Sequence, residues 1–199
     1  MIVSRRNLLA GAGGVAALSL ADAMIAPASA AQIEAIGLQL YTVRDIFAKD
    51  PVGTLEQVAR IGYREVEFGG GGYDAMDHAL LRGTMDRLGL KAPSLHIGYD
   101  ALLGQFDRSV TMAKALGADT VVLPYMTDEH RTEQGWRAAL PNFNRFAAEL
   151  KKAGLGFAYH NHDFEFTNRP GGTSLYDRFL GETDAALVKV ELDLYWAAH

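Results

Sequence analysis

The sequence predicts an α/β protein of the (βα)8 TIM-barrel class, and this 199-residue chain supplies about five βα units and a sixth strand. Short apolar segments alternate with amphipathic helical segments, a pattern typical of a parallel sheet covered by helices. Glycines recur where the helical segments end, at spacings of about one βα unit. Polar residues follow nearly every apolar segment, as at the active face of a barrel.

Six short segments have the composition of strands. In chain order they are 36–41, 65–68, 92–96, 120–123, 156–159 and 188–193. Four glycines suit the left-handed position that ends a helix, and they are Gly62, Gly89, Gly117 and Gly154. The helix expected before Gly154 has one apolar stripe, formed by Trp136, Leu140, Phe143, Ala147 and Leu150. Such a stripe predicts a helix packed on the sheet.

An open, doubly wound sheet is the alternative architecture. A dinucleotide-binding sheet needs a glycine-rich phosphate turn after its first strand, and residues 42–45 contain no glycine. Glycines 69–72 follow the second strand, but no helix start of the G-x-G-x-x-G type follows them. A typical barrel has roughly 250 residues, so we expect 31–199 to be a C-terminally truncated barrel. As given, the chain is expected to be inactive and poorly soluble as a monomer, because its edge strands would be unpaired.

Residues 1–30 are predicted to be a cleaved twin-arginine signal peptide. Arg5 and Arg6 precede a weakly apolar segment at 10–26, and Ala28-Ser29-Ala30 supplies a cleavage signal. A membrane anchor is the alternative, but Asp22 interrupts the run, which lacks about 20 continuous apolar residues. We therefore expect a periplasmic or secreted protein with no stable membrane anchor.

The composition excludes several classes of function. The formal net charge is −5 and no Lys/Arg cluster occurs, which argues against nucleic acid as a partner. There is no cysteine, so disulfides and thiolate metal sites are excluded. The oligomeric state is not indicated.

Residues 159–166, YHNHDFEF, carry the densest group of functional side chains. His160 and His162 lie at i and i+2, so on an extended backbone they point to the same side. Glu191 and Asp193 share one face at the end of the sixth strand. Other predicted strands also end on polar residues, namely Gln39, Glu67, His96 and Tyr125. Imidazoles and carboxylates gathered at strand ends predict a divalent-metal or acid–base site.

Five motifs together resemble the sugar phosphate isomerase/epimerase family, whose members have the xylose-isomerase-like barrel. They are GLQLYTVR at 37–44, EVEF at 65–68, SLH at 94–96, YHNHDFEF at 159–166 and ELDLYW at 191–196. The resemblance covers essentially all of 33–199. It implies a divalent metal, commonly Mn²⁺, with Mg²⁺, Co²⁺ or Zn²⁺ as alternatives. It also places a metal ligand at Asp193. Where the family usually has a glutamate ligand, this chain has His160, and two further ligands of the family would lie beyond His199.

We accordingly assign His160 and Asp193 to metal binding, with Glu165 as a further candidate. Three residues are assigned to catalysis, Glu67, Glu191 and His162, and four to substrate binding, Gln39, His96, Tyr125 and Trp196. Each assignment has a structural alternative. Asp193 could cap a following helix, the histidines could be hydrogen-bonded core residues, and the aromatic residues could pack at the barrel rim.

Three functions remain open for such a site. The first is a metal-dependent isomerase or epimerase that moves a proton α to the carbonyl of a small carbohydrate. The second is a lyase or hydratase acting on keto-sugars or keto-glycosides. The third is a non-catalytic periplasmic carbohydrate-binding protein. Export from the cytoplasm and the lack of an evident phosphate cradle favour unphosphorylated sugars.

Overall fold

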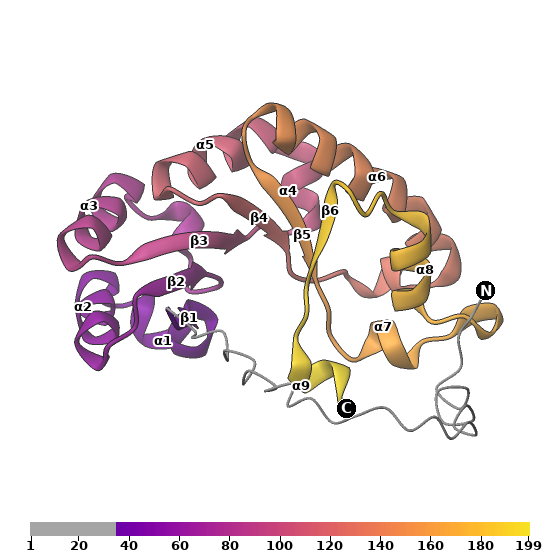
Figure 1. Cartoon of the computed structure of the whole chain (residues 1–199), viewed down its shortest axis with the longest axis horizontal. Coiled ribbons are helices and arrows are strands. Elements are labelled where there is room, and N and C mark those ends of the chain that lie inside the picture. Colours follow the sequence, from indigo (N-terminus) through magenta and orange to yellow (C-terminus); the bar gives the residue numbers. More distant parts are fainter. Residues whose placement is uncertain (1–34) are drawn as a thin grey trace, which may run out of the picture. The chain divides into compact units, whose positions relative to one another are not determined.

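The computed structural model describes residues 35–199, and Figure 1 shows how their elements are arranged. The predicted signal peptide at 1–30 lies outside the described residues. Across 35–199, no helix combines the length and the apolar character needed to cross a membrane.

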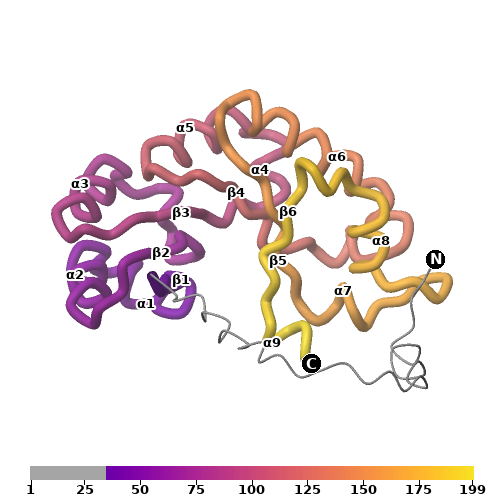
Figure 2. Tube along the Cα trace, viewed as in Figure 1, coloured from indigo at the N-terminus to yellow at the C-terminus, as the bar shows by residue number. Residues whose placement is uncertain are grey.

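Six parallel strands form one sheet, and each strand pairs with the next one in the chain. They are β1 (Gly37–Gln39), β2 (Glu65–Phe68), β3 (Lys91–His96), β4 (Thr120–Leu123), β5 (Gly156–His160) and β6 (Val188–Glu191). The trace in Figure 2 follows this order without a reversal. A doubly wound sheet would reverse its strand order, so the barrel prediction is confirmed for six consecutive strands.

Nine helices are assigned within 35–199. They are α1 (Arg44–Phe47), α2 (Pro51–Ile61), α3 (His78–Leu88), α4 (Tyr99–Gly104), α5 (Phe106–Leu116), α6 (Glu133–Lys152), α7 (Phe164–Thr167), α8 (Leu175–Glu182) and α9 (Leu194–Ala197). Helices α2, α3, α5 and α6 lie along the convex side of the curved sheet (Figure 1). The four glycines expected to end helices all have φ between 68° and 118°, which only glycine adopts at low cost.

The first and last strands are shorter than predicted. Residues 40–43 leave β1 and form a 3₁₀ turn, η2 (Leu40–Val43). The last strand ends at Glu191 instead of Asp193, because the Asp193 side chain accepts a hydrogen bond from the Trp196 amide and caps α9.

The core beneath the site is aromatic. Trp136 and Phe143 of the α6 stripe are fully buried, and their ring centroids lie 5.8 Å and 5.2 Å from that of Tyr159 on β5. Truncating a buried Phe or Trp to Ala typically costs about 3–5 kcal/mol. This packing fixes β5, and with it the direction of His160 at the end of the strand.

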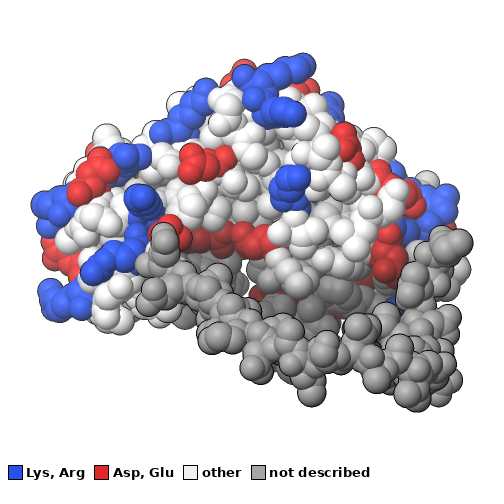
Figure 3. Space-filling view, in the orientation of Figure 1, with Lys and Arg blue, Asp and Glu red and all other residues white. Residues whose placement is uncertain are grey.

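The face seen in Figure 3 mixes basic and acidic side chains. Two exposed ion pairs involve α3. Arg82 and Asp86 pair within α3 at 2.9 Å, and Arg87 of α3 pairs with Glu56 of α2 at 3.1 Å. Exposed pairs of this kind contribute about 0–1 kcal/mol each.

Candidate metal centre

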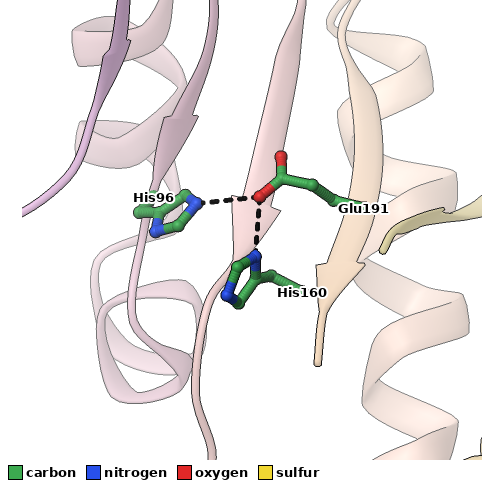
Figure 4. Close-up of side chains that lie close together, drawn as sticks. All are labelled: His96, His160 and Glu191. Carbon is green, nitrogen blue, oxygen red and sulfur yellow. Dashed lines mark hydrogen bonds and ion pairs between the residues drawn. The ribbon is translucent and has the colours of Figure 1, made fainter. Parts of the chain in front are cut away.

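Three side chains meet at the carboxyl ends of β3, β5 and β6 (Figure 4). Glu191 Oε1 lies 2.8 Å from His160 Nδ1 and 3.1 Å from His96 Nε2. Pairing of β5 with β6 places His160 directly opposite Glu191. Within 35–199 this is the one set of at least three metal-binding side chains whose donor atoms all lie within 4.8 Å of one another.

A second carboxylate, Glu67 at the end of β2, adjoins the cluster. Its Oε1 lies 2.9 Å from His96 Nε2 and accepts a hydrogen bond from Gln39 Nε2 at 2.7 Å. Ser94 Oγ donates to its Oε2 at 2.5 Å. A register shift between β2 and β3 sets Glu67 opposite Ser94. Neighbouring side chains therefore hold both oxygens of Glu67 in place.

Charge and burial act on the cluster in opposite directions. Burial lowers the pKa of His96, but hydrogen bonds to Glu191 and Glu67 outweigh burial and raise it to about 9. Burial raises the pKa of Glu191, while hydrogen bonds from His160 and His96 bring it well below its usual range. Both shifts favour a protonated His96 beside an ionised Glu191 at neutral pH without a metal.

Asp193 approaches the other nitrogen of His160. Its Oδ2 lies 3.7 Å from His160 Nε2, while its Oδ1 caps α9. Asn161 Nδ2 donates to the Asp193 carbonyl oxygen at 3.2 Å, and Asn161 Oδ1 accepts from the Asp193 amide at 2.9 Å. Asp193 therefore caps a helix, which was the structural alternative for this residue. Its other carboxylate oxygen still faces His160, the predicted metal ligand.

His162 lies beside the cluster among aromatic rings. Its ring centroid is 5.1 Å from that of His160, 5.2 Å from that of Tyr125 and 5.6 Å from that of Trp196. Burial, with the nearby charge of His160, lowers the pKa of His162 to about 4. Its Nδ1 is buried and has no hydrogen-bond partner among residues 35–199. A neutral imidazole in this place can accept a hydrogen bond, while burial disfavours its protonated form.

Glu165, the further metal candidate, lies outside the cluster. It is fully buried, with one oxygen accepting from the Tyr159 hydroxyl and the other from the His162 amide at 2.8 Å. Burial raises its pKa. In this arrangement Glu165 fixes the turn that carries His162.

A cavity of about 470 Å³ opens onto the cluster. Its walls come from the ends of β1, β3, β4 and β5 and include Gln39, Tyr41, His96, Tyr125, His160 and His162. A larger cavity, about 530 Å³, lies at the opposite, amino ends of the strands, where Arg82 and Asp86 form an ion pair in its wall. Because the larger one contains no converging metal donors, we take the cavity at the carboxyl ends as the site.

The three-residue cluster fits a divalent cation. Two imidazole nitrogens and a carboxylate oxygen are ligands that Mn²⁺ and Zn²⁺ accept together. They come from three different strands, which hold them at fixed spacing. Of these residues, the sequence predicted His160 as a ligand but assigned His96 to substrate and Glu191 to catalysis. The role of Ser94 was not foreseen, although its place two residues before His96 on one strand puts both side chains on the same face.

The chain belongs to the xylose isomerase-like TIM barrel family, whose model matches residues 55–199. It is similar to a solved sugar phosphate isomerase/epimerase from Parabacteroides distasonis ATCC 8503, with 27% identity and a TM-score of 0.68 over 85% of this chain and 69% of that one. No match was found among curated proteins.

Two more distant structures share the fold. A D-psicose 3-epimerase in the presence of D-fructose matches at 16% identity and TM-score 0.61, over 81% of this chain and 64% of that one. A xylose isomerase-like TIM barrel protein from Mycobacterium smegmatis in complex with magnesium matches at 14% identity and TM-score 0.58, over 78% and 63%. The chain spans less than two thirds of either protein.

Proposed function

We propose that this protein is an exported, metal-dependent isomerase or epimerase that moves a proton next to the carbonyl of a small, unphosphorylated carbohydrate. The observation that carries the proposal is the convergence of His96, His160 and Glu191 at the carboxyl ends of the strands, where His96 and His160 also line a cavity. The family and the isomerase/epimerase relative support the reaction class. Export rests on the sequence of residues 1–30 alone.

The proposed cation would be held by His96, His160 and Glu191. A divalent ion there supplies a Lewis acid that acidifies the hydrogen next to a substrate carbonyl. Glu67 is positioned by Gln39 and Ser94 beside the same point and is the proposed base. His162 is uncharged at neutral pH because its pKa is about 4, so its proposed part in catalysis is to hydrogen-bond the substrate beside the base.

The proposed substrate is uncharged. Among the described residues, those lining the cavity at the carboxyl ends include no Lys or Arg, the side chains that most often pair with a phosphate group. The lining instead offers imidazoles, an amide and tyrosine rings, which suit the hydroxyl groups and apolar faces of a sugar.

Metal binding is the first test. Glu191→Gln should lower the affinity for Mn²⁺ more than Asp193→Asn, because Glu191 faces the donors of His96 and His160 while Asp193 is engaged in capping α9. Loss of a residue that only orients a ligand costs about 10–100-fold in affinity, and we expect Glu191→Gln to exceed this range. Calorimetry measures the affinity of each variant for Mn²⁺, and elemental analysis measures the amount of bound metal. If Asp193→Asn instead loses more affinity for Mn²⁺ than Glu191→Gln, the cation is bound beside His160 Nε2, the nitrogen that faces Asp193.

The reaction is tested by NMR in D₂O with Mn²⁺ and a panel of keto-sugars and keto-glycosides. Deuterium at the carbon next to the carbonyl, without bond cleavage, supports an isomerase or epimerase. An unsaturated product would instead favour the lyase alternative. Absence of exchange with any metal contradicts both the isomerase or epimerase and the lyase alternative, and failure to bind any divalent metal contradicts the proposed metal dependence.

A further inference from the structure

Two half-exposed tyrosines lie at different strand ends in the cavity wall. Tyr41 follows β1 with 51% of its surface exposed, and Tyr125 follows β4 with 45% exposed. Strands β1 and β4 are three strand spacings apart, which is roughly 14 Å along the sheet at about 4.8 Å for each spacing. Because the sheet is curved, the straight-line distance between the two strands is shorter. Both line the same cavity as His96 and His160.

Each tyrosine has an arginine stacked on one face of its ring. The Arg44 guanidinium carbon lies 4.2 Å from the Tyr41 ring centroid, and that of Arg131 lies 4.4 Å from the Tyr125 centroid. Each guanidinium is also tied to the backbone nearby. Arg44 Nη1 donates to the Tyr41 carbonyl and Arg131 Nε to the Met126 carbonyl, both at 2.8 Å. With an arginine on one face and about half of the side chain exposed, each ring keeps surface that a ligand in the cavity can contact.

Neighbouring groups also hold the ring edges. Tyr41 lies against Gly70, where an added Cβ would come within 2.7 Å of Tyr41 Cδ2. Tyr125 makes edge contacts with His162 and Phe164, at centroid distances of 5.2 Å and 6.1 Å. Rings fixed before binding lose little conformational entropy when a ligand stacks on them.

We propose that the cavity binds a two-ring carbohydrate, a glycoside or disaccharide, with the reacting sugar on Tyr125 and the second ring on Tyr41. Tyr125 adjoins His162, and His162 adjoins His160 of the metal cluster, so the reacting ring belongs at that end. The cavity volume of about 470 Å³ falls within the ~300–1,000 Å³ of sites that enclose drug-sized ligands. The inference rests on the proposed function and narrows its substrate class.

The test compares one-ring and two-ring probes on the 199-residue chain with Mn²⁺ present. D-Glucose is the one-ring probe, and phenyl β-D-glucopyranoside and cellobiose are the two-ring probes, with affinities measured by calorimetry. The wild type should bind the two-ring probes about tenfold more tightly, the order expected for one added aromatic contact. Tyr41→Ala should remove this preference and leave D-glucose binding unchanged, while Tyr125→Ala should weaken all three.

Tyr41→Phe is the matched control, because it keeps the ring and removes only the hydroxyl. Tyr41→Phe should retain the preference for two-ring probes. A thermal melt of each variant checks that the variant is folded. Equal affinity of the wild type for one-ring and two-ring probes overturns the inference and leaves the carbohydrate function standing. Equal weakening of all probes by Tyr41→Ala overturns it too. If the folded wild type binds none of the probes, both the two-ring inference and the proposed carbohydrate function are overturned.

Discussion

His96 shows how the role of one residue depends on its neighbours in space. Its place at the end of a strand was predictable, and the sequence assigned it to substrate. In the structure its Nε2 contacts two carboxylates, Glu67 and Glu191, which come from strands on different sides of β3. Strand stagger and side-chain rotamers decide such contacts, and a single sequence does not encode them in any local pattern.

The raised pKa of His96 predicts a pH-dependent stability for the metal-free protein. A folded pKa of about 9 exceeds the value of about 6.5 expected in the unfolded chain. The ion pairs therefore contribute their full stability below pH 6.5 and lose it as the pH rises through about 9. The expected loss between these values is on the order of 2–3 kcal/mol in the free energy of unfolding.

Urea unfolding in EDTA at pH 6.5 and pH 9 measures this loss. His96→Gln is the control, since glutamine does not titrate and its stability should change much less over this interval. A wild type equally stable at both pH values would show that His96 is not protonated in the folded protein.

At the scale of elements, the order and approximate position of the six strands were the most predictable feature. The strands at 65–68 and 120–123 have the predicted bounds, because a helix-ending glycine lies shortly before each and Gly69 or Pro124 follows it directly. Short helices such as α4 and α7 follow no long apolar stripe and were not predicted. The truncated β6 follows from a local competition, in which Asp193 caps α9 instead of extending the strand.

The glycine loop after β2 gives a prediction with a matched control. Gly70 and Gly72 have φ of +67° and +73°, so alanine at either position is strained by about 1–2 kcal/mol. At Gly72 an added Cβ meets nothing within 4 Å, whereas at Gly70 it meets Tyr41. Gly70→Ala should therefore lower the free energy of unfolding more than Gly72→Ala, as measured by urea unfolding. Equal losses would mean that Tyr41 moves aside freely.

At the scale of the whole molecule, the sheet has two edges within residues 35–199. β1 pairs with β2 alone and β6 with β5 alone. A closed barrel has no such edges. Large apolar side chains are exposed on and after β6, including Val190 at 41%, Leu192 at 48% and Leu194 at 73%. Unpaired strand edges with exposed apolar residues favour pairing between chains.

The 199-residue chain should therefore associate as its concentration rises, and a charge on the β6 edge should weaken the association. Val190→Lys places a cation on that strand, a substitution that natural edge strands use against pairing. Leu103→Lys is the control, because Leu103 on α4 is similarly exposed, at 44%, but lies away from both edges. Sedimentation velocity should show less association for Val190→Lys and wild-type behaviour for Leu103→Lys. If both variants associate like the wild type, the contact between chains does not involve β6, and the edge of β1 becomes the surface to test.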